Sequence, residues 1–369
     1  MMTSSVSIER IERVCRSIEP PDVAWAERAA ARQACLTMPR GSLGRLLEVG
    51  RQLASLQRTD RPRGSPALAA VLAADHGVAE AGVSAYPREV TAQMVANYQS
   101  GGAALNVLAA RAGAAVRVAD LGVAGSIPHV STSSRLVSTR TSRPVRAGTS
   151  NWLEGPAMSR DEAFQAFATG LDLADLWLDE TSAVVVALGE MGIGNSTTSA
   201  ALLATMLDRE AGDVVGRGTG VDDEGLARKR AAVARGLALH HHDAVDLWDR
   251  AARLGGFEII GLAGLAVGAA SRHTLVVLDG LISTTAGLLA TRICPPVRDF
   301  LLAAHLGPEP GHALALDALR LDPLLRLDLR LGEASGAALA LPIVAAAADI
   351  LRDMASFESA GVSDLETAS

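Results

Sequence analysis

The chain has 369 residues, of which 49% are hydrophobic and 20% are charged, and its formal net charge is -7. This composition is typical of a soluble globular protein and excludes an intrinsically disordered chain. The acidic balance, the lack of a basic block and the small number of aromatic residues argue against nucleic acid as a partner.

Cysteine usage and the amino-terminal residues indicate a cytoplasmic protein. Cys15, Cys35 and Cys294 lie far apart without a CxxC pair, which is typical of free thiols in a reducing compartment. The first twenty residues carry too many charges for a secretory signal. Apolar stretches such as residues 336–348 fall short of the roughly 20 residues that a membrane span needs. We therefore expect a cytoplasmic location and no membrane partner.

Proline-containing segments divide the amino-terminal part of the chain. Residues 7–56 have a helical pattern that breaks at Pro20 and Pro21, and an Arg- and Pro-rich link follows at residues 58–66. Such a link is typical of a boundary between structural units. We therefore expect an amino-terminal helical segment over residues 1–62, an α/β domain over residues 63–335 and a carboxyl-terminal helical segment over residues 336–369.

A strand and a polar segment open the expected α/β domain. Residues 67–74 are an unbroken apolar run that stops at Asp75, His76 and Gly77, and this abrupt stop favours a strand over a helix. In parallel α/β sheets, ligands bind beyond the carboxyl ends of the strands, where this polar segment would lie. Pro87 then begins a helix, which the two glycines at residues 101–102 interrupt.

Ser84, Tyr86 and Gln93 provide two hydroxyls and an amide near that helix start. Each of them, taken singly, is more simply explained as a turn or surface residue.

Residues 125–152 are rich in Ser, Thr, Arg and Pro and predict a long loop with little regular structure. Residues 161–177 have the pattern of an amphipathic helix that leads into the next strand.

Residues 182–207 are the stretch around which the rest of the chain is organised. A β-branched apolar run comes first and predicts a strand buried on both faces, and an Ala- and Leu-rich helix comes last. Gly189, Gly192 and Gly194 lie between them. Glycine lets the backbone approach a ligand closely, and free N–H groups at a helix start point at an anion. This combination predicts a phosphate-binding turn.

The glycine spacing completes neither of the common nucleotide motifs. Gly189 and Gly194 match the front half of a P-loop, but Asn195 stands where the lysine is required, which disfavours nucleoside triphosphate hydrolysis. The dinucleotide motif fails because residue 197 is threonine. A glycine turn without a ligand remains an alternative at this point. Glu190 favours a ligand, because a carboxylate beside a phosphate loop needs a partner such as a ribose hydroxyl.

A second glycine loop, at residues 214–220, precedes another predicted helix. Asp222 or Asp223 can cap this helix, where a negative charge is also favourable. Lys229, the only lysine in the chain, would lie one to two turns into the helix.

Three consecutive histidines, His240, His241 and His242, follow on the same helix. Successive helical residues point about 100° apart, so the three cannot bind one metal ion, and we expect a solvated helix face. The sequence offers no other ligand cluster, and we expect neither a metal nor a cofactor.

Two further segments carry an acidic residue at an expected strand or helix end. Asp279 follows a predicted strand in a superficial match to the pyrophosphate-sugar loop of ordinary phosphoribosyltransferases, which normally has two adjacent acids. Here Gly280 occupies the second position, so we do not rely on this match. Glu333 lies among small residues before an Ala-rich helix. The simpler alternative for Glu333 is an acid that interacts with the helix dipole.

Ten strings together resemble one family, nicotinate-nucleotide–dimethylbenzimidazole phosphoribosyltransferase of cobalamin lower-ligand synthesis. In chain order they are GSLGRL, AADHGV, GVSAYP, EVTAQMV, GEMGIGN, GRGTG, GGFEIIGLAG, LDGLISTTA, EPGH and RLGEASGAAL. The resemblance covers nearly the whole chain. It implies an α/β fold with a Rossmann-like parallel sheet flanked by helices, a small helical domain formed from both chain ends, and a homodimer.

The resemblance also implies a reaction and the residues that perform it. Phosphoribose passes from nicotinate mononucleotide to 5,6-dimethylbenzimidazole, or to a related base, and the products are α-ribazole 5′-phosphate and nicotinate. The family's catalytic base falls on Glu333. Its phosphate and ribose contacts fall on Glu190, Gly192, Gly194, Asn195, Gly218, Thr219, Gly220 and Lys229, and its base pocket falls on Ser84, Tyr86 and Gln93.

The sequence departs from the family pattern before EPGH. Ala304 and Gly307 replace two serines that are frequent in the family, which leaves the preferred base open, while His305, Glu309 and His312 remain.

Two alternative functions stay open from the sequence alone. One is a diphosphate-dependent phosphoribosyltransferase, and the other is a non-catalytic nucleotide sensor on the same fold.

Overall fold

The computed structural model describes residues 2–127, 137–140, 145–240 and 244–363. Its central element is a six-stranded parallel sheet with the strand order β3-β2-β1-β4-β5-β6. This order reverses direction between β1 and β4, as in a doubly wound Rossmann-like sheet. The strands are β1 (Ala67–Ala74), β2 (Ala115–Gly122), β3 (Val137–Arg140), β4 (Val185–Met191), β5 (Leu275–Leu278) and β6 (Leu301–Ala303). The predicted fold class is confirmed.

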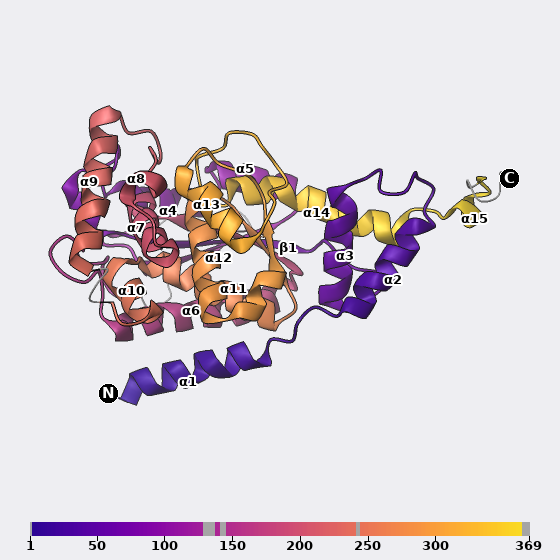
Figure 1. Ribbon diagram of the computed structural model, residues 1–369, viewed down its shortest axis with the longest axis horizontal. Helices are drawn as coiled ribbons and strands as arrows, with labels where there is room; N and C mark the ends of the chain where they lie inside the picture. The colour runs from indigo at the N-terminus through magenta and orange to yellow at the C-terminus, as the bar shows by residue number, and fades with distance from the viewer. Residues whose placement is uncertain (1, 128–136, 141–144, 241–243, 364–369) are drawn as a thin grey trace.

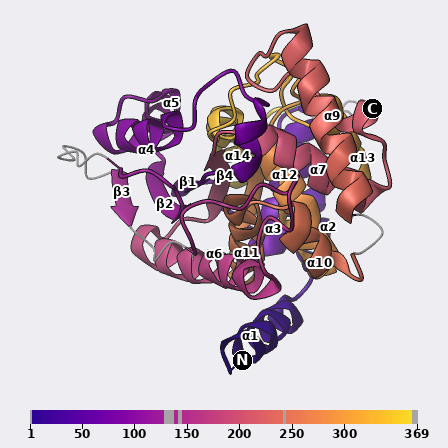
Figure 2. The same ribbon diagram turned by 90° about the vertical axis from the view of Figure 1, so that its left-hand side faces the viewer.

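Helices cover both faces of the sheet (Figures 1 and 2). One layer contains α11 with α6 and α12, and the other contains α4, α5 and the first half of α14. The helices of this α/β body are α4 (Val90–Ser100), α5 (Ala104–Arg111), α6 (Arg160–Thr181), α7 (Asn195–Leu207), α8 (Ala211–Val214), α9 (Asp223–His240), α10 (Leu247–Leu254), α11 (Phe257–Ser271), α12 (Leu281–Ile293), α13 (Pro310–Leu319) and α14 (Ser335–Asp353), with the 3-10 helices η1 (Gly77–Ala81) and η2 (Pro295–Phe300).

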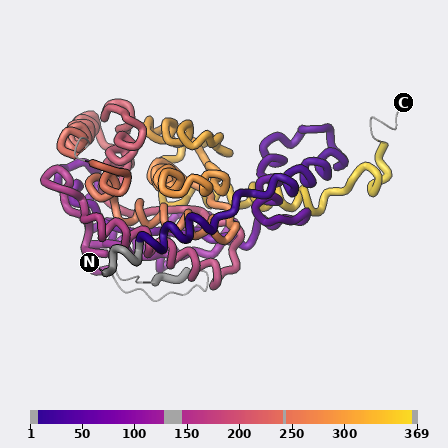
Figure 3. The backbone as a smooth tube through the Cα atoms, turned by 60° about the horizontal axis from the view of Figure 1, so that its bottom comes forward, coloured from indigo at the N-terminus to yellow at the C-terminus, as the bar shows by residue number. Residues whose placement is uncertain are grey.

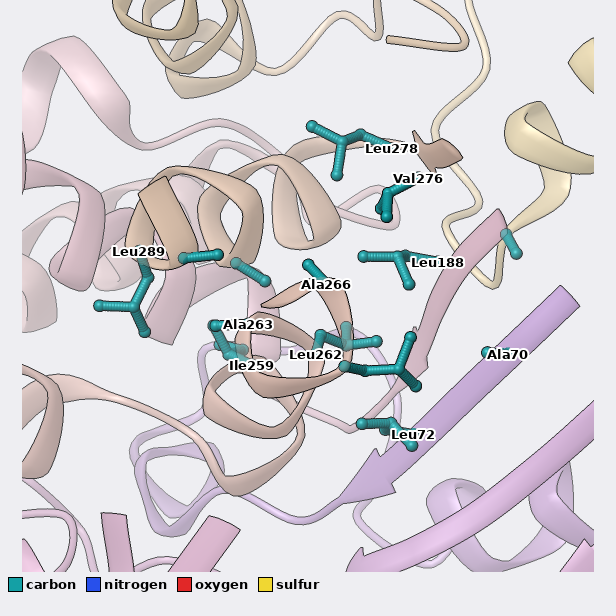
Figure 4. Packing of buried hydrophobic residues seen from close by; sticks show 14 of the residues in the cluster. Ala70, Leu72, Leu188, Ile259, Leu262, Ala263, Ala266, Val276, Leu278 and Leu289 are labelled. Carbon is teal, nitrogen blue, oxygen red and sulfur yellow. The ribbon is translucent and has the colours of Figure 1, made fainter. Parts of the chain in front are cut away.

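The core lies between the sheet and α11. The strands β1, β4 and β5 are buried along their whole length, as their unbroken apolar runs predict. Figure 4 shows their side chains against those of α11 and α12; the labelled residues are Ala70, Leu72, Leu188, Ile259, Leu262, Ala263, Ala266, Val276, Leu278 and Leu289. Glycines let α6 approach α11 closely, since a Cβ at Gly264 would lie 2.0 Å from the carbonyl oxygen of Phe167.

The edge strand β3 corrects the expectation of a long irregular loop over residues 125–152. Its residues Val137–Arg140 pair in parallel with β2. Because it is an edge strand with one hydrogen-bonded neighbour, it does not need the apolar run that identifies a central strand. Residues 128–136 and 141–144 lie outside the described part of the chain.

A small helical bundle projects from the α/β body (Figures 1 and 3). It contains α2 (Val23–Ala34), α3 (Arg45–Gln57), the second half of α14 and the short α15 (Phe357–Ala360). The two chain ends are joined there by an antiparallel bridge between Leu36 and Ser356 and by Arg32, which donates to the carbonyl oxygen of Leu351 at 2.5 Å.

The amino-terminal helix α1 (Met2–Ser17) lies outside this bundle and packs against α6 and α11. Its Arg10 pairs with Asp172 of α6 at 2.6 Å. The division at residues 62 and 335 stays a prediction; α14 begins at Ser335 and continues without a break from the sheet into the bundle.

The helix α14 also bears on the expectation about membrane spans. Within the described residues it is the one helix that is long and apolar enough to cross a membrane by length and composition. More than half of its apolar window is buried, and it packs against β4, β5 and α3. This is the packing of a core helix.

The histidine segment at the end of α9 differs from the expected solvated face. His240 is buried, and its Nε2 lies at hydrogen-bond distance, 2.7 Å, from the carbonyl oxygen of Trp152. His241 and His242 lie outside the described residues.

Of the two residues expected to cap the start of α9, Asp222 is the one that does so: its carboxylate accepts from the backbone N–H of Gly225 at 2.7 Å. Asp223 is exposed and pairs with Arg217 instead.

Candidate active site

A cavity of about 690 Å³ opens beyond the carboxyl ends of β4, β5 and β6. Its wall is made by the start of α7, the glycine loop before α9, the start of α4 and the segment that leads into α14. This position, next to the point where the strand order reverses, is where doubly wound sheets bind their ligands.

The turn between β4 and α7 brings backbone close to the cavity. Gly192 passes so near to β1 that an added Cβ would lie 2.2 Å from the carbonyl oxygen of Ala74. Gly194 precedes α7 with a φ of +97°, a left-handed conformation that glycine adopts without strain, and no side chain caps the helix. The helix start is therefore available to an anion.

Lys229 supplies, from another helix, the cation that a P-loop carries next to its glycines. It is buried in α9, and its Nζ donates to Oγ of Ser196 in the first turn of α7 at 3.0 Å. Burial lowers the pKa of Lys229, while the nearby Glu309 raises it. The loop before α9 lies close by, since a Cβ at Gly218 would be 2.9 Å from Nζ. The two glycine loops and the lysine thus meet at one corner of the site.

Glu309 fixes the second glycine loop. Its Oε1 accepts from the backbone N–H of Gly218 at 2.8 Å. Its Oε2 is buried and has no partner among the described residues. No sequence pattern indicated this role separately, because a single acid before a proline-initiated helix is most simply a capping residue.

Two glutamates from distant parts of the chain meet in the cavity wall. The carboxylate of Glu190, at the end of β4, accepts from the backbone N–H of Glu333 at 3.3 Å and also from the side chain of Asn195. Burial raises the pKa of Glu190 to about 8, with further contributions from the charges of Glu258, Glu333 and Asp279. Near neutral pH Glu190 therefore holds a proton.

Glu333 lies just before α14 in a backbone conformation that side chains rarely adopt. Its φ is +61°, and that of Ala334 is +59°. Such left-handed non-glycine residues store strain and are common at functional sites. Burial raises the pKa of Glu333, a hydrogen-bonding interaction with Tyr98 lowers it, and the charge of Asp279 raises it.

Tyr98 is a residue that the sequence did not single out. It is completely buried in α4, and its hydroxyl has no partner of full hydrogen-bond geometry in the described chain, although it faces Glu333. Burial raises its pKa well above the usual value, and Glu333 raises it further. Its position in a helix after Pro87 carried no pattern that separates it from a core residue.

Two histidines close the side of the cavity near β6. Burial and then the charge of His305 lower the pKa of His312 to about 3, so His312 is neutral. Its Nδ1 accepts from the backbone N–H of Gly307 at 3.0 Å, so Nε2 carries the proton and donates to Thr284 at 3.1 Å. His305 Nε2 lies 3.6 Å from the carboxylate of Asp279, and its Nδ1 has no partner in the described residues.

Most of the residues expected to bind phosphate and ribose lie in the cavity wall. These are Glu190, Gly192, Gly194, Asn195, Gly218 and Thr219, and Glu333 joins them. Lys229 lies behind Ser196, and Gly220 lies outside the lining, beside Arg330.

The residues expected to bind the base are only partly brought together. Ser84 and Tyr86 line the cavity. Gln93 is exposed and does not line it, because the first turn of α4 directs this position to solvent. Met94 and Asn97 of the same helix contribute to the wall instead. Within the described residues, no group of three or more His, Cys, Asp or Glu side chains has the arrangement of a metal site.

Comparison with known proteins agrees with this geometry. A family model described as phosphoribosyltransferase matches residues 18–362. A nicotinate-nucleotide–dimethylbenzimidazole phosphoribosyltransferase from Roseiflexus sp. (strain RS-1) is 48% identical over 346 residues, which cover 94% of this chain and 96% of the relative. The chain belongs to the nicotinate-nucleotide–dimethylbenzimidazole phosphoribosyltransferase family.

Other members support the assignment over the same length. A relative of the same name from Desulforamulus reducens is 46% identical over 347 residues, which cover 94% of this chain and 97% of the relative. The crystal structure of CobT from Thermus thermophilus is similar to this chain, with a TM-score of 0.86 and 46% identity over 92% of this chain and 99% of that chain.

Proposed function

We propose that this chain transfers phosphoribose from nicotinate mononucleotide to 5,6-dimethylbenzimidazole, or to a related base. The products are α-ribazole 5′-phosphate and nicotinate, and the step belongs to assembly of the cobalamin nucleotide loop. The observation that carries the proposal is the meeting of Glu333 with the two glycine loops in one cavity, with Lys229 bonded to Ser196 of its wall, within a family whose named members match nearly the whole chain.

The nucleotide end of the cavity suits a phosphate monoester. The positive end of α7, which no side chain caps, and the ammonium group of Lys229 provide positive charge at one corner. Glu190, which holds a proton near neutral pH, can donate to a ribose hydroxyl or accept from one. Both glycine loops can therefore hold the ribose and its phosphate still while C1′ moves from one ring to the other.

The chemistry of the reaction requires one base. Nicotinate leaves as a neutral pyridine ring, so no general acid is needed, and attack from the opposite face converts a β-glycoside into an α-glycoside. The attacking nitrogen of the benzimidazole becomes cationic unless the other ring nitrogen loses its proton. Glu333, which is buried in the cavity wall, takes that proton. The raised pKa of Glu190 disfavours a second negative charge beside Glu333.

A product assay tests this function against both alternatives. Purified protein is incubated with nicotinate mononucleotide and a panel of benzimidazoles in the presence of a strong chelator, and the products are identified by mass spectrometry. We expect α-ribazole 5′-phosphate and nicotinate. Turnover that requires phosphoribosyl diphosphate and added magnesium would support the diphosphate-dependent enzyme. Tight nucleotide binding without product would support the sensor.

We further propose a homodimer located in the cytoplasm, with no nucleic-acid partner. Support for the dimer comes from two exposed apolar side chains that line the cavity, Tyr86 and Leu331, and from the bundle that projects from the α/β body. Light scattering after size-exclusion chromatography tests the dimer.

The free cysteines support the cytoplasmic location, which cell fractionation tests. The net charge of -7 disfavours nucleic acid, and fluorescence anisotropy with labelled DNA and RNA tests that.

A further inference from the structure

A buried histidine–glutamate pair lies directly beneath the first glycine loop. His76 follows β1, at the point where the strand order reverses, and its Nε2 lies 2.7 Å from Oε1 of Glu258. Both side chains are completely buried, and neither lines the cavity. Glu258 is in the first turn of α11, the helix that packs against β1 and β4 (Figure 2). The reaction derived above gives this pair no role.

The side chain of His76 fills the space that three glycines leave in two backbone segments. An added Cβ would lie 3.1 Å from His76 Nε2 at Gly192 and 3.3 Å from His76 Cβ at Gly194. At Gly256, just before α11, it would lie 2.3 Å from His76 Cε1. The imidazole ring therefore packs directly against the backbone of the β4–α7 turn. Without it the glycine backbone would lose its support on the side away from the cavity.

The carboxylate of Glu258 also influences the protonation of Glu190. Among the charged groups that influence Glu190, Glu258 has the largest effect, ahead of Glu333 and Asp279. Tyr98 also faces this cluster and carries no charge, because its pKa is raised well above the usual value. A negative charge at residue 258 disfavours a second one at residue 190.

We propose that His76 and Glu258 are a positioning pair for phosphoribosyl transfer: His76 supports the glycine loop that holds the nucleotide, and Glu258 orients His76. The proposal rests on the function proposed above. Neither residue touches the substrate, so their effects reach the reaction through the loop and through the protonation of Glu190.

Replacement of Glu258 tests the electrostatic part. Glu258→Gln keeps the size and a hydrogen-bond acceptor for His76 but removes the charge, so Glu190 should release its proton at lower pH, by about half to one pH unit. The titration is followed by NMR of carboxyl-labelled glutamate, with Glu190→Gln used to assign the resonance. This readout does not need turnover, so it separates failure of the pair from failure of the proposed reaction. An unchanged Glu190 titration in Glu258→Gln would overturn this part.

Replacement of His76 tests the support of the loop. His76→Ala should raise the KM for nicotinate mononucleotide at least tenfold with a smaller change in kcat, and His76→Gln, whose amide nitrogen approximates Nε2, should restore most of it. His240→Gln is the matched control, because His240 is also buried and bonded at 2.7 Å to a backbone carbonyl away from the loop. If His76→Ala does not fold, His76→Asn, whose shorter side chain does not reach the position of Nε2, takes its place, and His240→Asn is its control. Equal KM values for the His76 variant that lacks the Nε2 contact and for the matched His240 variant, after correction for folded fraction, would overturn the proposal.

Discussion

At the scale of single residues, the chemistry of this site depends on the protonation of two neighbouring carboxyl groups, those of Glu190 and Glu333. Glu190 and Glu333 are too close to be charged together without cost, and burial raises the pKa of both. The hydroxyl of Tyr98 opposes the effect of burial on the pKa of Glu333. The two identical side chains thus have different neighbours that shift their pKa values.

We expect Glu333→Gln to reduce kcat by roughly 10²–10⁴, the range for a positioned general base, because the amide cannot take the proton of the attacking base. Affinity for nicotinate mononucleotide should change little. Steady-state kinetics at saturating substrates and calorimetric titration measure the two effects. Glu89→Gln, a change of an exposed glutamate near the start of α4, is the control. Near-normal kcat in Glu333→Gln would remove this residue from the catalytic role.

Glu190 gives the stability of the protein a predictable dependence on pH. Its pKa is about 8 in the folded chain and near 4.5 when unfolded, so the folded state binds the proton more tightly. The stability that this group contributes is complete below pH 4.5 and is lost as the pH rises through 8. We expect Glu190→Gln, which cannot ionise, to lose less Tm between about pH 5 and about pH 8.5 than the unaltered protein. Parallel Tm curves for the two proteins would contradict the raised pKa.

Lys229 allows a chemical test, because it is the only lysine in the chain. An amine-reactive reagent labels at most Lys229 and the terminal amine, and the lowered pKa of Lys229 favours its reaction once the reagent reaches it. We expect nicotinate mononucleotide to protect Lys229 selectively. Replacement by Met should cost about 1.5–3 kcal/mol of nucleotide binding, the range for a hydrogen bond to a charged group. Equal labelling with and without saturating nucleotide would exclude Lys229 from the phosphate site.

At the scale of elements, the β4–α7 turn depends on the absence of a side chain at Gly192. We expect Gly192→Ala to raise the KM for nicotinate mononucleotide and to lower the Tm, because its Cβ would lie 2.2 Å from the backbone oxygen of Ala74 and the loop would have to move. Gly212→Ala is the matched control, since nothing lies within 4 Å of a Cβ there. Kinetics and thermal denaturation measure the two effects. Equal KM values in the two variants would show that the loop tolerates the displacement.

Elements of this kind were largely predictable because local patterns define them. The apolar run at residues 67–74 has the same bounds as β1, and the central strand, turn and helix are β4 and α7 with the glycines between them. The edge strand β3 was missed, since a run of four residues is too short to give a clear strand pattern in the sequence. His240 was misplaced because a run of histidines does not reveal the carbonyl of Trp152 that one of them meets.

Contacts between elements could not be read from the sequence in the same way. Lys229 meets Ser196 from 33 residues away, and His76 meets Glu258 from 182 residues away. No periodicity encodes such distances, because they are set by how the helices pack over the sheet. The first glycine loop was a candidate from its own pattern and the family resemblance supplied the role of Glu333, whereas the contacts of Tyr98 and Glu309 became visible only in the fold.

At the scale of the whole molecule, α14 connects the reactive carboxylate with the helical bundle. It begins two residues after Glu333, passes β4 and β5, and ends among α2 and α3. A helix of 19 residues spans about 28 Å, so a single element reaches from the cavity wall into the bundle. The bundle is therefore mechanically linked to the cavity although it contributes no lining residue within the described chain.

We expect the bundle and the sheet to unfold together for this reason. Leu351, in the second half of α14, is completely buried in a small cluster with Ala29 and Ala54. Leu351→Ala should lower the free energy of unfolding by about 2–5 kcal/mol, the usual cost of a buried Leu→Ala change. The transition should remain single, and saturating nicotinate mononucleotide should shift its midpoint upward. Leu239→Ala, at an exposed position of α9, is the control and should have little effect. Differential scanning calorimetry distinguishes the outcomes. A separate transition at lower temperature, with the nucleotide-stabilised transition unchanged, would show that α14 does not couple the bundle to the α/β body.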